Sequence, residues 1–197
     1  MHLLSFAPVL LLLLPFSLTL ASPLPEAEPS SLQPRQQTGS YTISGLGARK
    51  RQVTSAGADS FNLAIAMLET ERMTTDYVYG DGKSQDASNF GIFKQNWGML
   101  RVCCSKFKGQ SQANWNNGAA LNSDLYADVQ CLKECQGYYG RDRWLAGHRN
   151  GATGLANPNT QDIQNYINGV KYIQTQLTTQ PNGLTNDVRY YIYVVPI

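Results

Sequence analysis

Residues 60–69 constrain this chain more than any other stretch, because a helix formed there has almost no polar face. Apart from Asn62, residues 61–68 are all apolar. Asp59 or Ser60 can cap the start of this helix, since short polar side chains accept hydrogen bonds from its free backbone N–H groups. A helix that is apolar all round is stable only when other elements surround it. We therefore expect it at the centre of a core.

Glu69 ends this apolar run. A carboxyl at this position is shielded from water by its neighbours and lies near the negative end of the helix dipole, and both effects favour its neutral form. A carboxylic acid that stays protonated near neutral pH can act as a general acid. Glu71 lies on roughly the other side of the helix and is expected to face solvent.

A second carboxyl, that of Asp81, lies in the segment YVYGDGK at 77–83. Its glycines and aspartate favour a turn between short strands, a polar setting in which Asp81 stays ionised. Most enzymes that hydrolyse a glycosidic bond use one neutral carboxyl as general acid and one ionised carboxyl as base or nucleophile. Asp81 could equally serve only to stabilise the turn, and Asp86 is its nearest competitor for a catalytic role.

Four motifs stand out beyond these two carboxyls: AIAMLET at 64–70, YGDGK at 79–83, NFGIFKQNW at 89–97 and DRWLAGHRNG at 142–151. They resemble glycoside hydrolase family 134, whose members are endo-β-1,4-mannanases of the lysozyme-like superfamily, and the resemblance covers roughly residues 41–177. It implies an α+β, mostly helical, lysozyme-like fold with a small β-hairpin region beside an active-site cleft.

The resemblance also implies catalytic roles, with Glu69 as general acid and Asp81 as general base. In retaining lysozymes of the animal type, the second carboxylate directly precedes the aromatic-Gly-Ile of the hairpin, and Asn89 occupies that place here. Asn cannot act as the nucleophile. The family's assignment suits single-displacement hydrolysis with inversion, in which the two carboxyls stand roughly 6.5–9.5 Å apart to admit a water molecule.

Further residues in these motifs are candidates for binding the substrate: Asn89, Lys94, Asn96, Trp97, His148 and Arg149. Asn96 follows the hairpin, where lysozyme-like enzymes use an Asn against the sugar, or else it stabilises a turn. Trp97 is either a platform for a sugar ring or a core side chain. His148 and Arg149 lie in a Gly-punctuated segment that predicts a cleft-lining loop, where they contact sugar or order the loop.

Four cysteines predict two disulfides: Cys103, Cys104, Cys131 and Cys135. These bonds would join the segment after Trp97 to a helix on which Cys131 and Cys135 lie one turn apart. The pairing stays open, except that a bond between the adjacent Cys103 and Cys104 is sterically unfavourable. The spacing lacks the usual zinc pattern and secretion favours oxidised cysteines, so we expect no metal ion.

The N-terminal residues predict export from the cell. Residues 1–21 contain two apolar runs and end in a small-residue cleavage pattern, as in a secretory signal peptide. Residues 22–39 are rich in Pro, Glu, Ser and Gln and predict a disordered pro-segment or N-terminal arm. Residues 40–197 then form one catalytic domain. The export signal and the arm predict a secreted, extracellular protein.

The basic Arg49–Arg51 segment lies within the catalytic domain and is expected on a helix surface.

The charge balance narrows the class of partner. The formal net charge of the full chain is only +2. This is not the basic surface of a nucleic-acid binder, and it gives little attraction to an anionic bacterial wall. We expect β-1,4-mannan or manno-oligosaccharides as the substrate, no cofactor, no nucleic acid, no membrane after signal cleavage, and a monomer.

Hydrophobic periodicity predicts helices near 45–56, 60–72, 94–106, 119–136 and 159–179, with short strands within 77–93. The fifth of these helices carries an apolar stripe that is expected to be core: Ile163, Tyr166, Ile167, Val170, Ile173 and Leu177. Residues 188–196 are β-prone and predict a terminal strand.

These patterns, with the resemblance, predict a secreted, inverting endo-β-1,4-mannanase. Two alternatives stay open. One is a cell-wall hydrolase of the lysozyme or chitosanase type, which would cut amino-sugar polymers instead of mannan. The other is a non-catalytic carbohydrate-binding protein on the same fold, since a fold alone does not guarantee a function.

Overall fold

The computed structural model of the chain describes residues 37–195. Its α-helices are α1 (Leu46–Ser55), α2 (Ser60–Glu69), α3 (Trp97–Cys103), α4 (Ala120–Ser123), α5 (Leu125–Tyr139), α6 (Arg141–Ala156) and α7 (Gln161–Thr179). The strands are β1 (Thr38–Thr42), β2 (Asn89–Phe90), β3 (Gln95–Asn96) and β4 (Val188–Ile192), and three 3₁₀-helices are η1 (Tyr79–Gly82), η2 (Gln85–Ala87) and η3 (Gln112–Ala119). The expected α+β, mostly helical, lysozyme-like fold is confirmed.

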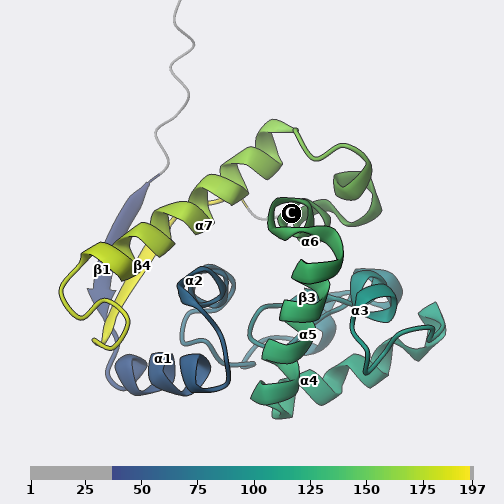
Figure 1. Ribbon diagram of the computed structural model, residues 1–197, viewed down its shortest axis with the longest axis horizontal. Helices are drawn as coiled ribbons and strands as arrows, with labels where there is room; N and C mark the ends of the chain where they lie inside the picture. The colour runs from purple at the N-terminus through teal and green to yellow at the C-terminus, as the bar shows by residue number, and fades with distance from the viewer. Residues whose placement is uncertain (1–36, 196–197) are drawn as a thin grey trace, which may run out of the picture. The chain divides into compact units, whose positions relative to one another are not determined.

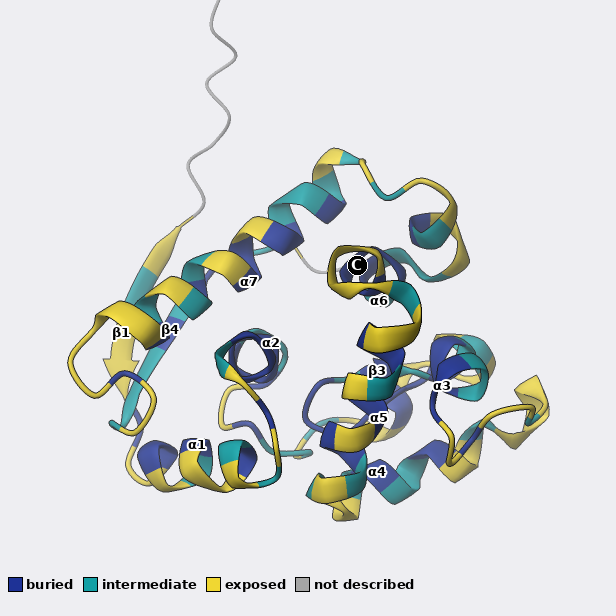
Figure 2. Cartoon of the chain, viewed as in Figure 1, coloured by how far each residue is buried: buried dark blue, intermediate teal, exposed yellow. Residues whose placement is uncertain are grey.

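Helix α2 lies in the core, as its apolar sequence predicts. Figure 1 shows it between α1 and α7, and in Figure 2 nearly its whole circumference is buried. The Oδ1 of Asp59 accepts a hydrogen bond of 2.9 Å from the backbone N–H of Asn62 and so caps the helix start. The helix ends after Glu69, because Thr70 takes an extended backbone with φ −137°. The central helix thus delivers one carboxyl at its C-terminal end.

Strands β1 and β4 pair antiparallel, with Thr38 opposite Ile192 and Thr42 opposite Val188. The expected terminal strand is therefore present as β4, and it contacts α2 and α7. Strand β1 includes residues 38 and 39, the last two of the expected N-terminal arm. The expected signal peptide, residues 1–21, and the arm up to residue 36 lie outside the described residues. No helix within 37–195 is long and apolar enough to cross a membrane.

Lys50 corrects one expectation about the basic segment at 49–51. That segment was expected on a helix surface, but Lys50 is fully buried in α1. Its ammonium donates hydrogen bonds to the backbone oxygens of Gly183 at 2.8 Å and Val188 at 2.7 Å, and to Oδ1 of Asn186 at 2.9 Å. A buried ammonium is tolerated only when its donors are satisfied. Lys50 therefore ties the segment between α7 and β4 to α1.

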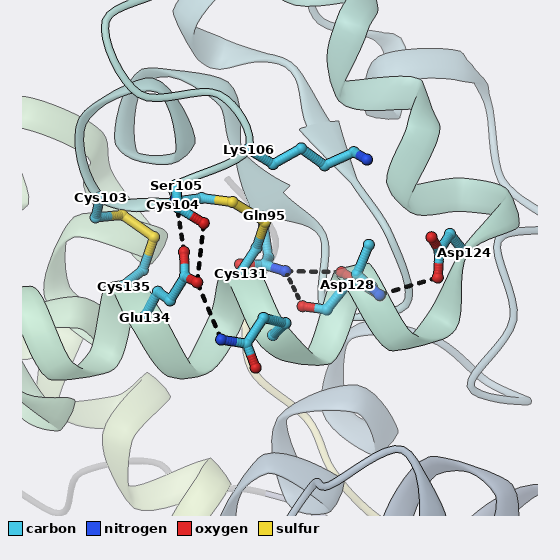
Figure 3. The surroundings of a disulfide bond; sticks show 12 residues. Gln95, Cys103, Cys104, Ser105, Lys106, Asp124, Asp128, Cys131, Glu134 and Cys135 are labelled. Carbon is cyan, nitrogen blue, oxygen red and sulfur yellow. Dashed lines mark hydrogen bonds between the residues drawn. A yellow bond between two sulfur atoms is a disulfide. The ribbon is translucent and has the colours of Figure 1, made fainter.

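Both expected disulfides are present, and the structure gives their pairing. Cys103 is bonded to Cys135, and Cys104 to Cys131. Figure 3 shows the two bonds side by side between the end of α3 and one face of α5. Glu134 adds a further tie on α5, because it accepts hydrogen bonds from the backbone N–H of Ser105 at 2.6 Å and from its hydroxyl at 3.0 Å. Helix α3 is therefore fixed against α5.

Two predicted helices differ from those in the structure. The predicted helix at 94–106 is shorter, because residues 95–96 pair with β2 and the helix begins only at Trp97. The predicted helix at 119–136 is divided at Asp124, whose side chain accepts a 3.0 Å hydrogen bond from the N–H of Ala127 and caps α5. Much of the region predicted as strands within 77–93 forms η1 and η2 instead.

Helix α6 is the main correction to the predicted secondary structure. Residues 144–151 were expected to form a loop, yet they lie within α6, which is interrupted only at Asn150 and Gly151. A glycine in a helix costs about 1 kcal/mol relative to alanine. Burial of the α6 side chains Trp144, Leu145 and Ala146 in the core outweighs that cost.

Candidate active site

A cleft of about 710 Å³ opens where the end of α2, η1, the β2–β3 hairpin, α3, α6 and α7 meet. Both expected catalytic carboxyls, those of Glu69 and Asp81, line it. Most of the expected substrate-binding residues line it as well: Asn89, Lys94, Asn96, His148 and Arg149. Residues far apart in sequence thus converge on one cavity, as the motif pattern predicted.

One oxygen of Glu69 is held by two side chains from different helices. His148 Nε2, on α6, lies 3.0 Å from Oε1 of Glu69, and the hydroxyl of Tyr166, on α7, donates to the same oxygen at 2.5 Å. The Glu69 side chain is 15% exposed and that of His148 only 5%. Within residues 37–195, the other oxygen, Oε2, makes no hydrogen bond. The carboxyl is therefore anchored through one oxygen only.

The charge state of Glu69 differs from the expectation. Burial by itself raises the pKa of Glu69, but the charge of His148, the hydrogen bonds from His148 and Tyr166, and the charge of Lys94 outweigh it. The pKa of Glu69 therefore lies below its ordinary value. The expected preference for the neutral form is wrong, because the hydrogen bonds and positive charges at this helix end favour the ionised form.

Asp81 is presented by an unusual backbone. Gly80, Asp81 and Gly82 all have left-handed conformations, with φ of 61°, 60° and 71°. Glycine adopts this region without penalty, and aspartate tolerates it better than most residues do. A non-glycine residue held there is typical of functional sites. The Gly-Asp-Gly sequence therefore allows the chain to turn tightly and direct one carboxyl at the cleft.

Two side chains of the hairpin hold Asp81. Lys94 Nζ donates to Oδ1 at 2.8 Å, and Asn89 Nδ2 donates to Oδ2 at 3.1 Å. Burial raises the pKa of Asp81, but the hydrogen bonds from Lys94 and Asn89, with the charges of Lys94 and Lys83, lower it below its ordinary value. Asp81 is therefore ionised, as expected. Asn89 and Lys94 position this carboxylate.

The hairpin that carries Lys94 is docked on α5 by the buried Asp128. Oδ2 of Asp128 accepts a 2.7 Å hydrogen bond from the N–H of Ile92. Gln95 Nε2 donates to Oδ1 of Asp128 at 2.7 Å (Figure 3). Gly91 permits this close approach, because a Cβ there would lie 2.0 Å from Oδ1 of Asp128. The position of Lys94 beside Asp81 thus depends on a carboxyl beneath the hairpin.

His148 and Arg149 come from a helix instead of the expected loop. The His148 ring stacks on Trp144 at 4.8 Å between centroids. Arg149 is largely buried, and its guanidinium donates to Asp162 at 2.7 and 3.1 Å and to the backbone oxygen of Val195. Arg149 therefore joins α6, α7 and the C-terminal segment at the edge of the cleft.

The family comparison agrees with this geometry. The model of Glycosyl hydrolase family 134 matches residues 47–194, which include every residue of the cleft. The chain belongs to glycosyl hydrolase family 134. The resemblance stated from the four motifs is thereby confirmed. No curated protein matches the chain in sequence.

Two expected sugar contacts of this family 134 glycoside hydrolase have different outcomes. Asn96 lines the cleft and is half-buried. Trp97 is fully buried and packs edge-on against Phe107 at 5.4 Å between centroids. Of its two interpretations, the core side chain is the one found, because a ring without exposed faces cannot stack on a sugar.

Tyr166 is the site residue of the family 134 protein that the sequence did not reveal as functional. It was expected only as part of the apolar stripe of α7, and all six members of that stripe are indeed buried. Its hydroxyl nevertheless reaches Glu69, 97 positions earlier in the chain. A buried tyrosine usually finds a partner for its hydroxyl, which is the feature that could have pointed to it.

Ion pairs compensate most of the charge in the family 134 cleft. Lys94 pairs with Asp81, Arg101 with Asp86 through two hydrogen bonds of 2.7 and 2.8 Å, and Arg149 with Asp162. Asp86, the competitor of Asp81, is thus occupied by a guanidinium. Within residues 37–195, no group of three or more His, Cys, Asp or Glu side chains is arranged to hold a metal ion.

Proposed function

We propose that this family 134 glycoside hydrolase is a secreted endo-β-1,4-mannanase that cleaves internal mannosidic bonds with inversion. The observation that carries the proposal is the pair Glu69 and Asp81, which line one cleft in different surroundings. Glu69 is anchored through one oxygen at a helix end, whereas Asp81 is held through both oxygens in a left-handed turn. Such a difference suits one acid and one base.

Glu69 acts as the general acid. Because Oε1 is occupied by His148 and Tyr166, the proton is carried on Oε2 and passes to the glycosidic oxygen as the bond to the anomeric carbon breaks. The contacts of Glu69 with His148 and Tyr166 and the charge of Lys94 lower its pKa. Entry of a sugar excludes water from the carboxyl, which strengthens the effect of burial and favours the protonated form.

Asp81 acts as the general base. It takes a proton from the water molecule whose oxygen forms the new bond to the anomeric carbon, on the face opposite the leaving group. Its lowered pKa favours the ionised form, which is the form that a general base needs. Exchange with solvent afterwards returns a proton to Glu69 and removes one from Asp81, so the enzyme is restored without a cofactor.

The charge of the cleft supports a neutral polysaccharide as the substrate. Lys94, Arg101 and Arg149 are each paired with a carboxylate, so that among the lysines and arginines lining the cleft only Lys83 has no ion pair within residues 37–195. An anionic polymer would need unpaired cations to bind it. The amide of Asn96 and the mixed polar and apolar lining provide contacts for sugar hydroxyls and ring faces.

Secretion is part of the same proposal. Two disulfides fit an extracellular protein, because such bonds persist in oxidising compartments. The signal-peptide pattern of residues 1–21 predicts that the exported chain begins after Ala21 or, if the arm is also removed, further on. Expression of the full chain in a secreting host, with mass spectrometry of the N-terminus in the medium, tests this directly.

A substrate panel tests the activity. The secreted protein is incubated with β-1,4-mannan, peptidoglycan and chitosan, and new reducing ends are measured. Release of short manno-oligosaccharides from mannan alone supports the proposal. Release from peptidoglycan or chitosan alone would favour the cell-wall hydrolases, and binding of mannan without turnover would favour the carbohydrate-binding protein.

A further inference from the structure

The Oε1 of Glu69 is the meeting point of two donors whose roles the proposed reaction does not assign. Tyr166 and His148 approach it from α7 and α6, and their rings lie 5.6 Å apart between centroids. Tyr166 was expected only as part of the apolar core, where it is indeed buried, and His148 was expected to contact sugar or to order a loop. In the structure both side chains also contact this carboxyl.

The direction of these hydrogen bonds follows from the chemistry of the groups. An ionised carboxylate only accepts hydrogen bonds, so the Tyr166 hydroxyl and His148 Nε2 both donate. The other ring nitrogen of His148, Nδ1, is buried with no partner within residues 37–195. Nε2 is the ring nitrogen that faces the carboxylate, so its proton is the one that forms this hydrogen bond.

Both donors are fixed by their own neighbours. The His148 ring is stacked on Trp144 with an interplanar angle of 8°. The Tyr166 ring lies under the guanidinium of Arg149, 5.8 Å from its centroid, and Arg149 is itself held by Asp162. Neither ring is free to turn away from Glu69 without disturbing the packing of α6 against α7.

We propose that Tyr166 and His148 are positioning residues, a pair of donors that occupy Oε1 of Glu69 and leave Oε2 to carry the proton to the leaving group. The inference rests on the proposed role of Glu69 as general acid. A carboxyl held through one oxygen keeps the other at a defined place, and general acid catalysis depends strongly on such placement.

The same contacts bear on how Glu69 titrates. Two donors stabilise its ionised form, and Lys94 on the hairpin adds a positive charge. The other charged or titratable side chains that line the cleft are Asp81, Lys83, Asp86, Arg101 and Tyr139. Tyr77 also feels the charge of Glu69, and Arg149 faces Tyr166 from α6. Removal of one donor therefore raises the pKa of Glu69, whereas loss of a contact with the sugar leaves it unchanged.

The experiment combines a titration without substrate and kinetics with mannan. The glutamate side-chain carboxyls are labelled with ¹³C, and the resonance of Glu69 is assigned by its absence in Glu69→Gln. Its titration is compared in the wild type, Tyr166→Phe and His148→Gln. Tyr172→Phe is the matched control, because Tyr172 lies on α7, packs partly against the core and does not line the cleft.

In Tyr166→Phe we expect the titration midpoint of the Glu69 carboxyl to rise by about one pH unit, because one hydrogen bond to the ionised form is lost. We expect kcat to fall about tenfold to a hundredfold while KM stays within about threefold. His148→Gln keeps a donor near Oε1 and should retain more of kcat than His148→Phe. Tyr172→Phe should leave the midpoint and kcat unchanged.

A rise in KM with an unchanged Glu69 midpoint would overturn the proposal and make Tyr166 a sugar contact. An unchanged midpoint with unchanged kcat would also overturn it. The titration needs no substrate, so it stands apart from the proposed function. A wild-type protein that cleaves no mannan would contradict the mannanase assignment, while an upward midpoint in Tyr166→Phe would still show that Tyr166 acts on Glu69.

Discussion

The ammonium of Lys94 lies 2.8 Å from Oδ1 of Asp81, and the same charge lowers the pKa of Glu69. One cation therefore acts on both carboxyls of the cleft. Its place is fixed by the hairpin and by the ring of Tyr77, whose centroid lies 4.9 Å from Nζ. A contact of this kind links the titration of the proposed acid to that of the proposed base.

Replacing Lys94 with Gln should raise the pKa of both Asp81 and Glu69, because the charge that favours their ionised forms is removed. Both limbs of the profile of kcat/KM against pH should move upward by about 0.5–1 pH unit. Lys83→Gln is the control. Lys83 acts on Asp81 but is not among the groups that shift the pKa of Glu69, so the alkaline limb, which follows Glu69, should stay in place. A Lys94→Gln profile identical to the wild type would contradict this account.

In the wild type, the profile of kcat/KM against pH should have its maximum at acidic pH. The proposed mechanism needs Asp81 ionised and Glu69 protonated, and the pKa of each lies below its ordinary value, 3.8 for Asp81 and 4.5 for Glu69. Above the pKa of Glu69 the protonated fraction falls about tenfold per pH unit, and kcat/KM should fall with it.

The profile of kcat should extend further toward neutral pH than that of kcat/KM. The bound sugar excludes water and raises the pKa of Glu69, and kcat reports the pKa values of the complex. Steady-state kinetics in buffers of constant ionic strength measure both profiles. A kcat/KM that stays constant from about pH 4 to pH 8 would be incompatible with Glu69 as the acid.

Glu69→Gln and Asp81→Asn should each lower kcat about 10²–10⁴-fold, since neither amide can give or take the required proton. The amide oxygen introduced by Glu69→Gln still accepts from Tyr166 and His148, so affinity for mannohexaose should be retained, as isothermal titration calorimetry can show. Glu71→Gln is the control, because Glu71 is exposed and outside the cleft. If Glu69→Gln or Asp81→Asn turned over substrate at nearly the wild-type rate, that residue could not be the proposed acid or base.

Asp128 should make the protein less stable as the pH rises. Burial raises the pKa of Asp128 to about 8, above its ordinary value of 3.8. The folded state therefore holds a proton that the unfolded chain releases. The stabilising contribution of the protonated form is complete below about pH 4 and is lost progressively up to about pH 8.

Denaturant unfolding at pH 5 and pH 8 tests this prediction, with Asp128→Asn as the comparison. The amide does not titrate in this range, so the loss of unfolding free energy between the two pH values should be smaller in the variant by up to about 4 kcal/mol. Equal losses in both proteins would show that Asp128 does not titrate as stated.

The sequence predicted the features of the fold that follow from local patterns. The apolar run at 61–68 predicted that α2 lies in the core, and the buried stripe on α7 and the presence of two disulfides, though not their pairing, were also predicted. Helix α6 was missed because its glycines weaken a helical pattern locally, while burial of residues such as Trp144 acts through the tertiary structure.

The candidate site could be predicted only in part for the same reason. Glu69 and Asp81 lie in short motifs and reach one cleft as expected. The partners that set the charge of Glu69 come from α6 and α7, 79 and 97 residues along the chain, and no local pattern links them. Lys50 shows the same limit, since its partners begin 133 residues later.

The most direct test of the account is the anomeric configuration of the first products. The secreted protein is incubated with mannohexaose, and the new reducing ends are followed by proton NMR before mutarotation equilibrates them. Inversion at a β-mannosidic bond predicts that α-anomers appear first. Initial β-anomers would contradict the single-displacement roles of Glu69 and Asp81, and the absence of any cleavage of mannohexaose would contradict the mannanase assignment itself.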